Sequence, residues 1–483
     1  MIAIRPVGYV IGLLVAALGG TMLLPFGLDI ITEGSDWRSF ALGAALTMTA
    51  GIILVLACSS RQGVMALGVH ETLLLTSSTW LVLPIFGAIP IYLGEADASF
   101  TDAFFEAMSG LTTTGSTIFT DLESLPAGTH LWRGMLQWFG GIGIIVVAMA
   151  FLPSLRIGGM QLFRSEAFDT MGKILPRAVE IAGSISAIYA TLTAMCFLAY
   201  LGVGMDTLDA IVHAMTTIAT GGFSTHNDSF AAFPPAAEYI AVSFMIAAAL
   251  PFVRYVQLLN GGVLPLLNDS QVRSFLGLLL AVIAMLVAWL LLVQGWTSEP
   301  ALRKVAFNAT SILTGTGYAS ADYMLWGEFP VTLLFLMGLV GGCAGSTCCS
   351  IKIFRFQLLY AAVSTQVRQI VSPRGVFIPR YEGRPVSDDV MSSVMAFFVL
   401  FVVTVGVVAM LLGLMGLDPI TAVSGAVTAV ANIGPGLGPD IGPTGNFAEL
   451  PSKAKWVLAF AMLIGRLELM SVYVLFTLRF WRG

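Results

Sequence analysis

The chain has 483 residues, of which 57% are hydrophobic and only 11% are charged, and its mean hydropathy is +0.89. A water-soluble globule of ordinary composition cannot bury that much apolar surface, so we predict an all-α integral membrane protein. The formal net charge of −5 identifies no partner by itself. The five cysteines lie in or beside apolar segments, which excludes the spaced disulfide framework of a small secreted domain.

Ten apolar segments are long enough to cross a bilayer, which takes about 20 helical residues. The first resembles a signal peptide, but it is long and has no A-x-A-like cleavage site, so we keep it in the mature protein. The predicted spans are residues 6–26, 39–58, 71–93, 132–153, 179–201, 236–258, 274–294, 329–352, 390–416 and 454–478.

Lysine and arginine are distributed unevenly among the connections. With a cytoplasmic N-terminus, fifteen of the 23 basic residues fall on the cytoplasmic side and six on the outer side, while Arg254 and Arg466 fall within spans. An excess of Lys and Arg marks the cytoplasmic loops of membrane proteins. The bias predicts a multi-pass membrane protein with both termini in the cytoplasm.

Four outer connections differ from simple loops. Residues 94–131, 202–235, 295–328 and 417–453 are long, partly apolar and rich in Gly, Thr and Ser. Non-helical backbone enters a membrane only where protein or a water-filled path shields it. We therefore expect these connections to dip into the membrane and return.

One motif recurs in all four connections. The copies are FEAMSGLTTTGS from Phe105, VHAMTTIATGGF from Val212, FNATSILTGTGY from Phe307 and SGAVTAVANIGP from Ser424. Each copy has Ser or Thr four places after its start and Gly ten places after it, which gives the pairs Ser109 and Gly115, Thr216 and Gly222, Ser311 and Gly317, and Thr428 and Gly434. The pattern predicts four pseudo-symmetric helix/pore-loop/helix repeats around one central pore, preceded by an N-terminal helix hairpin.

Such a ring of segments suits a monovalent cation. A dehydrated ion needs about six to eight oxygens, and converging backbone carbonyls can supply them. Glycine admits positive φ, which lets consecutive carbonyls point the same way. No carboxylate lies in these stretches, which argues against a divalent-cation site. Hydroxyls that could add oxygens or hold the segments belong to Thr113, Thr114, Thr220 and Thr316.

The acidic residues before the motifs fit the same interpretation. Asp102, Asp206, Asp209 and Asp418 fall near the outer N-terminal ends of the helices that we expect before each glycine. The partly negative C-terminal ends would then point toward the membrane centre and favour a cation there. The alternative is that the small residues serve helix packing alone, which is the better explanation for a single copy but not for four.

These residues resemble the Trk/Ktr/HKT superfamily of cation transporters, and most closely its TrkH-type potassium-uptake subunits, over nearly the whole chain. Two further motifs carry the resemblance, GGCAGSTCCSIK from Gly341 to Lys352 and IGRLELM around Arg466. In that family the first motif is a flexible intramembrane loop that gates the pore. This sequence departs from the family at Cys348, Cys349 and Ser350, where small and glycine-rich residues are usual.

The resemblance implies a division of the chain and two sets of site residues. The expected units are an N-terminal hairpin over residues 1–70 and pore repeats over residues 71–155, 179–260, 274–352 with the gating loop, and 390–480. The implied filter residues, where potassium would bind, are Thr113, Thr114, Gly115, Thr220, Gly221, Gly222, Gly315, Thr316, Gly317, Asn432, Ile433 and Gly434. The implied gating residues are Gly341, Gly342, Gly345, Ser346, Thr347, Lys352 and Arg466.

Arg466 also has an interpretation that does not depend on the resemblance. An arginine at membrane depth usually faces a cavity or a partner, and it would repel a cation in a pore. The alternative is a structural pair with Glu468 or with loop carbonyls. A metal site formed by Cys343, Cys348 and Cys349 lacks a fourth ligand nearby and is disfavoured.

The resemblance implies potassium uptake by a homodimer in the lipid bilayer, under a cytosolic nucleotide-binding regulatory subunit. The chain has no Rossmann or P-loop signature, so we expect no organic cofactor in it and no nucleic-acid partner. The basic segment from Lys352 to Arg384 is a candidate docking surface, or simply carries ordinary cytoplasmic charge. A proton- or sodium-coupled symporter is the alternative function. No H-E-x-x-H or G-x-S-x-G element appears, which argues against an enzyme.

Overall fold

The computed structural model describes residues 4–59, 68–150, 178–259 and 261–482. Most of these residues belong to helices, and a single two-stranded hairpin is the one sheet in the described chain. Residues 151–155, which end the expected first repeat, residues 60–67 of the expected hairpin and residue 260 lie outside the described part.

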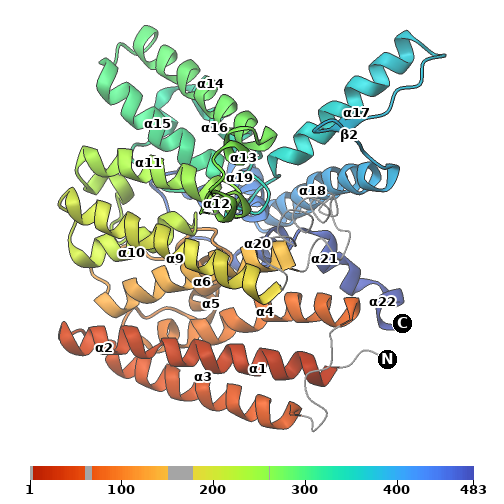
Figure 1. The fold of residues 1–483 in the computed structure, drawn as a ribbon. Helices are drawn as coiled ribbons and strands as arrows, with labels where there is room; N and C mark the ends of the chain where they lie inside the picture. Colours follow the sequence, from red (N-terminus) through yellow and green to blue (C-terminus); the bar gives the residue numbers. More distant parts are fainter. Residues whose placement is uncertain (1–3, 60–67, 151–177, 260, 483) are drawn as a thin grey trace.

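The N-terminal hairpin packs α1 against α3 along their length, and both lie at one edge of the molecule in Figure 1. Small residues permit this close approach, since a side chain on Gly12 or Gly51 would collide with the backbone of the facing helix. The helices of the N-terminal region and of the first two glycine motifs are α1 (Ile4–Thr21), α2 (Leu23–Ile31), α3 (Trp37–Cys58), α4 (Val69–Leu93), α5 (Phe100–Leu111), α6 (Ala127–Ala150), α9 (Ala178–Gly202), α10 (Thr207–Ile218), α11 (Pro235–Ala249), α12 (Phe252–Leu259) and α13 (Leu264–Leu267).

The second half of the chain follows the same alternation of long and short helices. α17 departs from it, because it extends away from the bundle and is followed by the hairpin (Figure 1). The elements are α14 (Ser270–Leu292), α15 (Ser298–Thr314), α16 (Glu328–Gly338), α17 (Ile353–Val371), β1 (Arg380–Tyr381), β2 (Arg384–Pro385), α18 (Asp388–Leu414), α19 (Pro419–Ala431), α20 (Ser452–Arg466), α21 (Met470–Tyr473) and α22 (Leu478–Arg482). Short 3-10 turns cover Ser229–Ala232, Tyr323–Trp326 and Val474–Phe476.

Six helices of the described chain are long and apolar enough to cross a membrane, and the number reaches eight if each of two bent pairs is one span. The bends are 91° between α11 and α12 and 107° between α20 and the turn that begins at Met470. The predicted span 329–352 is helical only to Gly338, because the Gly- and Ser-rich run that follows does not continue the helix. The protein is therefore a helical membrane protein with several broken helices.

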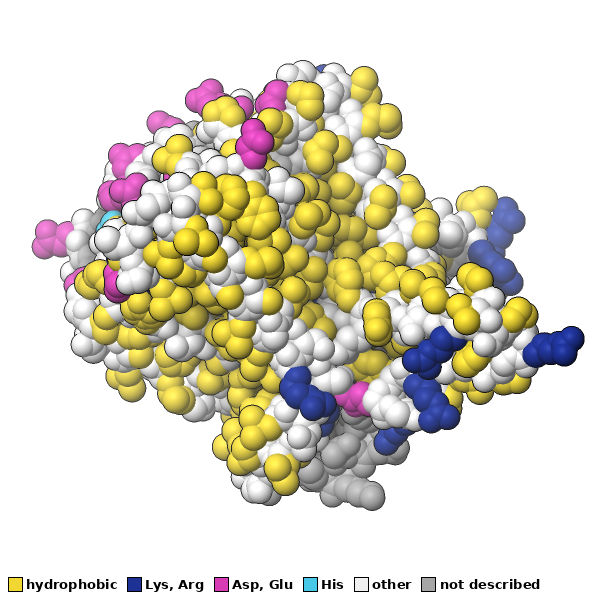
Figure 2. All heavy atoms as spheres, turned by 90° about the horizontal axis from the view of Figure 1, so that it is seen from above, with side chains coloured by type: hydrophobic (Ala, Val, Ile, Leu, Met, Phe, Trp, Pro, Cys, Tyr) yellow, Lys and Arg dark blue, Asp and Glu magenta, His cyan; other side chains and the backbone are white. Residues whose placement is uncertain are grey.

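Charge separates the two ends of the bundle. In Figure 2 acidic side chains gather at one end, Lys and Arg gather at the other, and hydrophobic side chains cover the surface between them. The start of α1 and the end of α22 lie on the same side of the molecule in Figure 1. An apolar belt between two charged ends is the surface expected of a membrane-spanning bundle.

Candidate functional site

Four short helices, α5, α10, α15 and α19, lead to the four glycine motifs. The side chains of Ser99, Asp206 and Asp418 cap α5, α10 and α19 by accepting backbone N–H groups, whereas α15 has no side-chain cap. Hydrogen bonding by Thr421 lowers the pKa of the Asp418 carboxyl. Acidic residues in the first turns are Asp102, Asp209 and Glu299. These negative charges complement the N-terminal ends, so the partly negative C-terminal ends lead into the glycines.

The stretches that end each motif, residues 113–115, 220–222, 315–317 and 432–434, share one backbone conformation; we call them the glycine segments. In each, the residue before the last glycine donates its N–H to the repeated Ser or Thr carbonyl five places earlier. These bonds are Thr114 to Ser109, Gly221 to Thr216 and Thr316 to Ser311, each 2.8 Å, and Ile433 to Thr428, 3.0 Å. The φ values are positive at the first residue of each segment (53°, 49°, 70° and 53°) and at the glycine (86°, 82°, 84° and 108°). The turn that begins at the repeated Ser or Thr thus ends at the residue directly before the repeated Gly.

The four glycines form a closed ring in chain order. A Cβ atom added to any of them would lie less than 3.0 Å from the carbonyl oxygen of the residue before the glycine in the next segment. The facing pairs are Gly115 with Gly221, Gly222 with Thr316, Gly317 with Ile433, and Gly434 with Thr114. Four segments separated by about a hundred residues each therefore meet through backbone, at distances that only glycine permits.

The threonine hydroxyls hold the segments in place. Thr114 Oγ1 lies 2.8 Å from Thr112 Oγ1, and Thr316 Oγ1 lies 2.7 Å from Thr314 Oγ1. Thr220 Oγ1 donates to the Ala219 carbonyl over 2.8 Å. Of the two roles expected for these hydroxyls, the geometry shows the structural one.

Residues of α6 brace the second segment, and the motif pattern gave no sign of them. Gln137 donates from Nε2 to the Gly221 carbonyl over 2.5 Å and accepts the Phe223 N–H at Oε1 over 3.1 Å. Arg133 pairs with Glu106 at 2.8 Å and donates to the Ser224 carbonyl. The i,i+4 spacing of two polar side chains in an apolar helix was a signal that could have identified this face.

Burial adds a structural role to the assignment of Arg133. We expected it among the six basic residues of the outer side, and its side chain is only 1% exposed and lies 4.3 Å from the centre of the Phe223 ring. Because Arg133 pairs with a fully buried carboxylate, it stabilises the site and is not an exposed loop charge.

The fourth segment uses an asparagine where the first two use threonine. Asn432 donates from Nδ2 to Thr114 Oγ1 over 2.9 Å and to the Met462 carbonyl over 3.0 Å. It thereby links the fourth segment to the first and to α20. Ile433, the next residue, contributes its backbone to the ring and turns its side chain to Gly338 of α16.

All of the predicted gating residues except Arg466 lie in a buried non-helical loop, residues 339–352. The loop begins and ends in a short parallel bridge between Val340 and Ile351. Cys343 and Thr347 donate their N–H groups to Ala249 and Ala248 at the end of α11, over 3.1 and 3.3 Å. The break between α11 and α12 leaves those carbonyls without helical hydrogen-bond donors, and the loop supplies donors in their place. The expected loop residues are here: Gly341, Gly342, Gly345, Ser346 and Thr347.

The far end of the loop reaches the glycine segments. Ser350 donates its N–H to the carbonyl of Ala431, the last residue of α19, over 3.0 Å. Cys349 Sγ lies 3.7 Å from Thr113 Oγ1. Lys352 directly precedes α17, and its ammonium group donates to the Cys348 carbonyl. The loop therefore touches the first segment directly.

Arg466, the last residue of α20, connects the loop to α20 and to α6. Its guanidinium donates to the Thr347 carbonyl over 3.4 Å, to Cys349 Sγ, and to the Gly140 carbonyl of α6 over 3.1 Å. The expected alternative pairing with Glu468 is wrong, because Glu468 pairs with Arg355 of α17. The contact with loop carbonyls, the other part of that alternative, is present.

No group of three or more His, Cys, Asp or Glu side chains within the described residues is arranged to hold a metal ion. Cys343, Cys348 and Cys349 are buried free thiols.

Comparisons with known proteins give matches over nearly the whole chain. The family model described as TrkH, cation transport protein, matches residues 38–481. The Trk system potassium uptake protein TrkI of Halomonas elongata is 43% identical over 99% of this chain and 97% of its own length. TrkH of Escherichia coli K12 is 35% identical over 99% of both chains.

A solved structure is similar over the whole chain as well. The crystal structure of the potassium transporter TrkH from Vibrio parahaemolyticus superposes with a TM-score of 0.90 at 32% identity, covering 99% of this chain and all of that one. The match in both sequence and structure therefore covers nearly the whole chain. The chain belongs to the TrkH family of Trk potassium-uptake transporters and is not an enzyme.

Proposed function

We propose that the chain carries potassium ions into the cell through one central pore whose selective part is formed by the four glycine segments. The observation that supports this is the closed ring in which each glycine faces the carbonyl of the next segment. Rings of backbone carbonyls can replace the water shell of a monovalent cation. The proposal includes four helix/pore-loop/helix repeats and ten transmembrane helices around the pore, with the units placed as the sequence predicts.

The proposed gate is the 339–352 loop together with Arg466. Its support is contact, since Cys349 lies beside Thr113 of the first segment and Arg466 holds the same cysteine. A buried guanidinium beside the path of a cation raises the energy of an ion there. Movement of the loop and Arg466 away from the segments would lower that barrier.

The proposed setting is the cell inner membrane, with both termini in the cytoplasm. The separation of acidic and basic side chains in Figure 2 supports this orientation. We place a cytosolic nucleotide-binding regulatory subunit on the basic segment from Lys352 to Arg384, and we take the assembly to be a homodimer. Exposed arginines on that segment are Arg368, Arg374, Arg380 and Arg384.

Ion flux into liposomes tests the proposal. Potassium and rubidium should enter faster than sodium and lithium, and Gly115→Ser should raise the share of sodium because its side chain meets the Gly221 carbonyl. Equal entry of sodium and potassium through the native protein would refute selectivity at this ring. Collapsing the proton and sodium gradients separately addresses the alternative, since potassium flux through a coupled symporter falls when its driving gradient is removed.

A further inference from the structure

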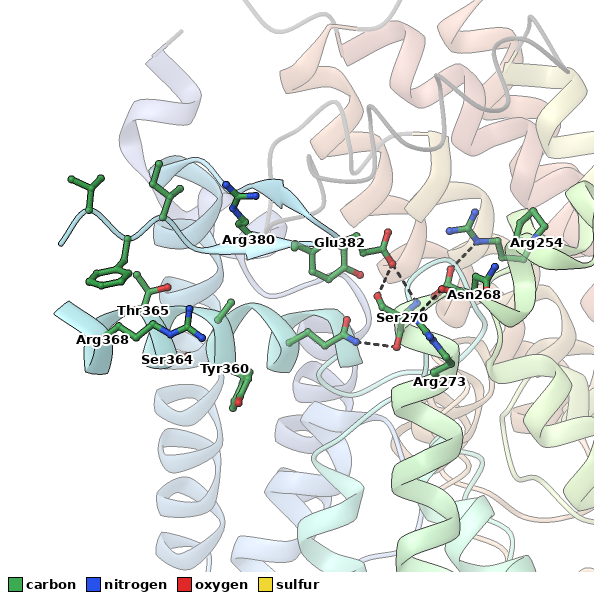
Figure 3. A pocket seen from close by; sticks show the side chains of 18 residues that line it. Arg254, Asn268, Ser270, Arg273, Tyr360, Ser364, Thr365, Arg368, Arg380 and Glu382 are labelled. Atoms are coloured by element: carbon green, nitrogen blue, oxygen red, sulfur yellow. Dashed lines mark hydrogen bonds and ion pairs between the residues drawn. The ribbon is translucent and has the colours of Figure 1, made fainter. Parts of the chain in front are cut away.

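A large cavity lies apart from the glycine segments and the 339–352 loop. It lies between the start of α14, the part of α17 from Gln357 to Arg368 and the β1–β2 hairpin (Figure 3). Its volume is about 870 Å³, which falls in the range of about 300–1,000 Å³ typical of ligand sites. None of its lining residues belongs to the candidate ion site. The transport proposal leaves this cavity unexplained.

Four arginines and two carboxylates line the cavity, and the carboxylates are already engaged. Asp269 pairs with Arg254 at 2.7 Å and caps α14 by accepting two backbone N–H groups. Glu382 accepts the Ser270 hydroxyl over 2.6 Å. Both therefore serve the start of α14, as the dashed lines in Figure 3 show.

The other three arginines keep their charge without an acidic partner. Arg273 donates to the Asn268 carbonyl over 3.3 Å, and Arg380 to the Gly383 carbonyl over 3.5 Å. Among the described residues, no carboxylate forms an ion pair with Arg273, Arg368 or Arg380. Arg273 lies at the α14 end of the cavity, whereas Arg368 and Arg380 lie at the end formed by α17 and the hairpin (Figure 3). Two guanidinium groups at that end can together bind an anion with several oxygens, such as a phosphate.

The rim of the cavity is apolar. The exposed fraction is 90% for Val376, 76% for Tyr360 and 56% for Ile378, and all three line the cavity. A free phosphate gains nothing from such a rim, whereas a phospholipid brings both an anionic headgroup and acyl chains. Arginine beside exposed apolar side chains is the surface found at the boundary between headgroups and hydrocarbon.

We propose that this cavity binds the phosphate headgroup of an anionic phospholipid from the cytoplasmic leaflet, with Arg368 and Arg380 as its ligands. Gln357 of α17, which lines the cavity, donates to the Ser270 carbonyl over 3.0 Å and to Ser274 Oγ over 2.8 Å. The lipid therefore binds to α17 and the hairpin, beside the contact of α17 with α14, and α17 begins directly after the 339–352 loop. A regulatory protein on the same segment still meets Arg374 and Arg384, which do not line the cavity.

Native mass spectrometry of the delipidated full chain, titrated with phosphatidylglycerol or phosphatidylcholine, tests the site without reference to ion flux. Phosphatidylglycerol should bind more tightly, and R368Q with R380Q should weaken its first binding step about fivefold per arginine. Both residues are exposed, so folding should persist. R374Q, the same charge change on the same segment but outside the cavity, should leave that step unchanged.

Four outcomes would overturn the proposal. Equal weakening by R374Q would mean diffuse charge attraction, and equal binding of phosphatidylcholine would mean that the headgroup charge is not recognised. Full displacement of the lipid by millimolar inorganic phosphate or glycerol 3-phosphate would assign the site to a soluble anion. A change of oligomeric state in the double variant, with lipid binding intact, would assign this face to a contact between copies of the chain.

Discussion

The glycine segments and the 339–352 loop are both glycine-rich, non-helical and buried, yet they are held in opposite ways. Each segment is fixed by the same turn hydrogen bond and the same contact with its neighbour, repeated four times. The loop is held once, by unrelated partners: the broken end of α11, the end of α19 and Arg466. A closed ring cannot move one member without disturbing the others, whereas the loop can exchange its single contacts. Glycine-rich backbone therefore forms both a rigid part of this protein and a part suited to movement.

The largest effect should come from breaking the ring. Replacing Gly317 with Ala places a methyl group against the Ile433 carbonyl and forces a positive φ, which alone disfavours alanine by about 1–2 kcal/mol. We expect potassium flux to fall by at least about tenfold. Gly434→Ala, whose Cβ would lie 2.8 Å from the Thr114 carbonyl and is the least crowded of the four, should be impaired least.

Gly277→Ala is the matched control for both changes, because that glycine lies in α14 with open space around it. Its flux and melting temperature should match those of the native chain. If Gly317→Ala transported ions as well as this control does, the ring would not be the conducting element.

The next effect concerns the ion pair between Arg355 of α17 and Glu468, which follows α20. Glu468→Gln removes the carboxylate that pairs with Arg355, which is buried beside the Phe397 ring, and removing one partner of a buried pair costs about 3–5 kcal/mol. We expect a clearly lower melting temperature. Replacing both residues, with Arg355→Met and Glu468→Gln, should recover part of the loss; no recovery would mean that the two side chains do not act as a pair.

Gln137 tests whether the second segment needs its brace. Gln137→Ala leaves the Phe223 N–H without its partner, and an unpaired buried group costs about 1–3 kcal/mol. The sodium share of the flux should rise while potassium still passes. Gln294→Ala, at an exposed glutamine that bonds only the Leu325 carbonyl in the described chain, should change neither quantity. An unaltered ion preference in Gln137→Ala would assign Gln137 to stability alone.

The smallest effect we expect is a gain. Arg466→Ala should raise potassium flux a few-fold if the guanidinium is a barrier, because it removes the charge beside Cys349. Arg466→Lys keeps the charge and should stay near the native rate. Unchanged or lower flux in Arg466→Ala, with a native melting temperature, would contradict the barrier role.

Periodic and compositional features of the site were predictable from the sequence. The spacing of Ser109 and Gly115, repeated at three other places, identified the residues that form the turn, because a turn hydrogen bond is local in sequence. The acidic N-terminal caps were predictable for the same reason. The roles of these residues in selecting an ion remain predictions.

The bracing contacts were not predictable from local pattern. Gln137 reaches a carbonyl 84 residues away, and Glu468 pairs with Arg355, 113 residues before it, and not with the nearby Arg466. Arg133 looked like an ordinary outer cation until its burial against Glu106 was visible. Such partners are chosen by how the helices pack, and single occurrences leave no periodic trace in a sequence.

The sequence by itself determined that this is a helical membrane protein with four related glycine motifs, because hydropathy and spacing act over short stretches of chain. Only the tertiary structure decided that the four glycines close into a ring, which loop lies against it, and which buried charges are paired. Those features depend on backbone contacts between segments about a hundred residues apart. At such contacts a fraction of an ångström decides whether a Cβ atom fits.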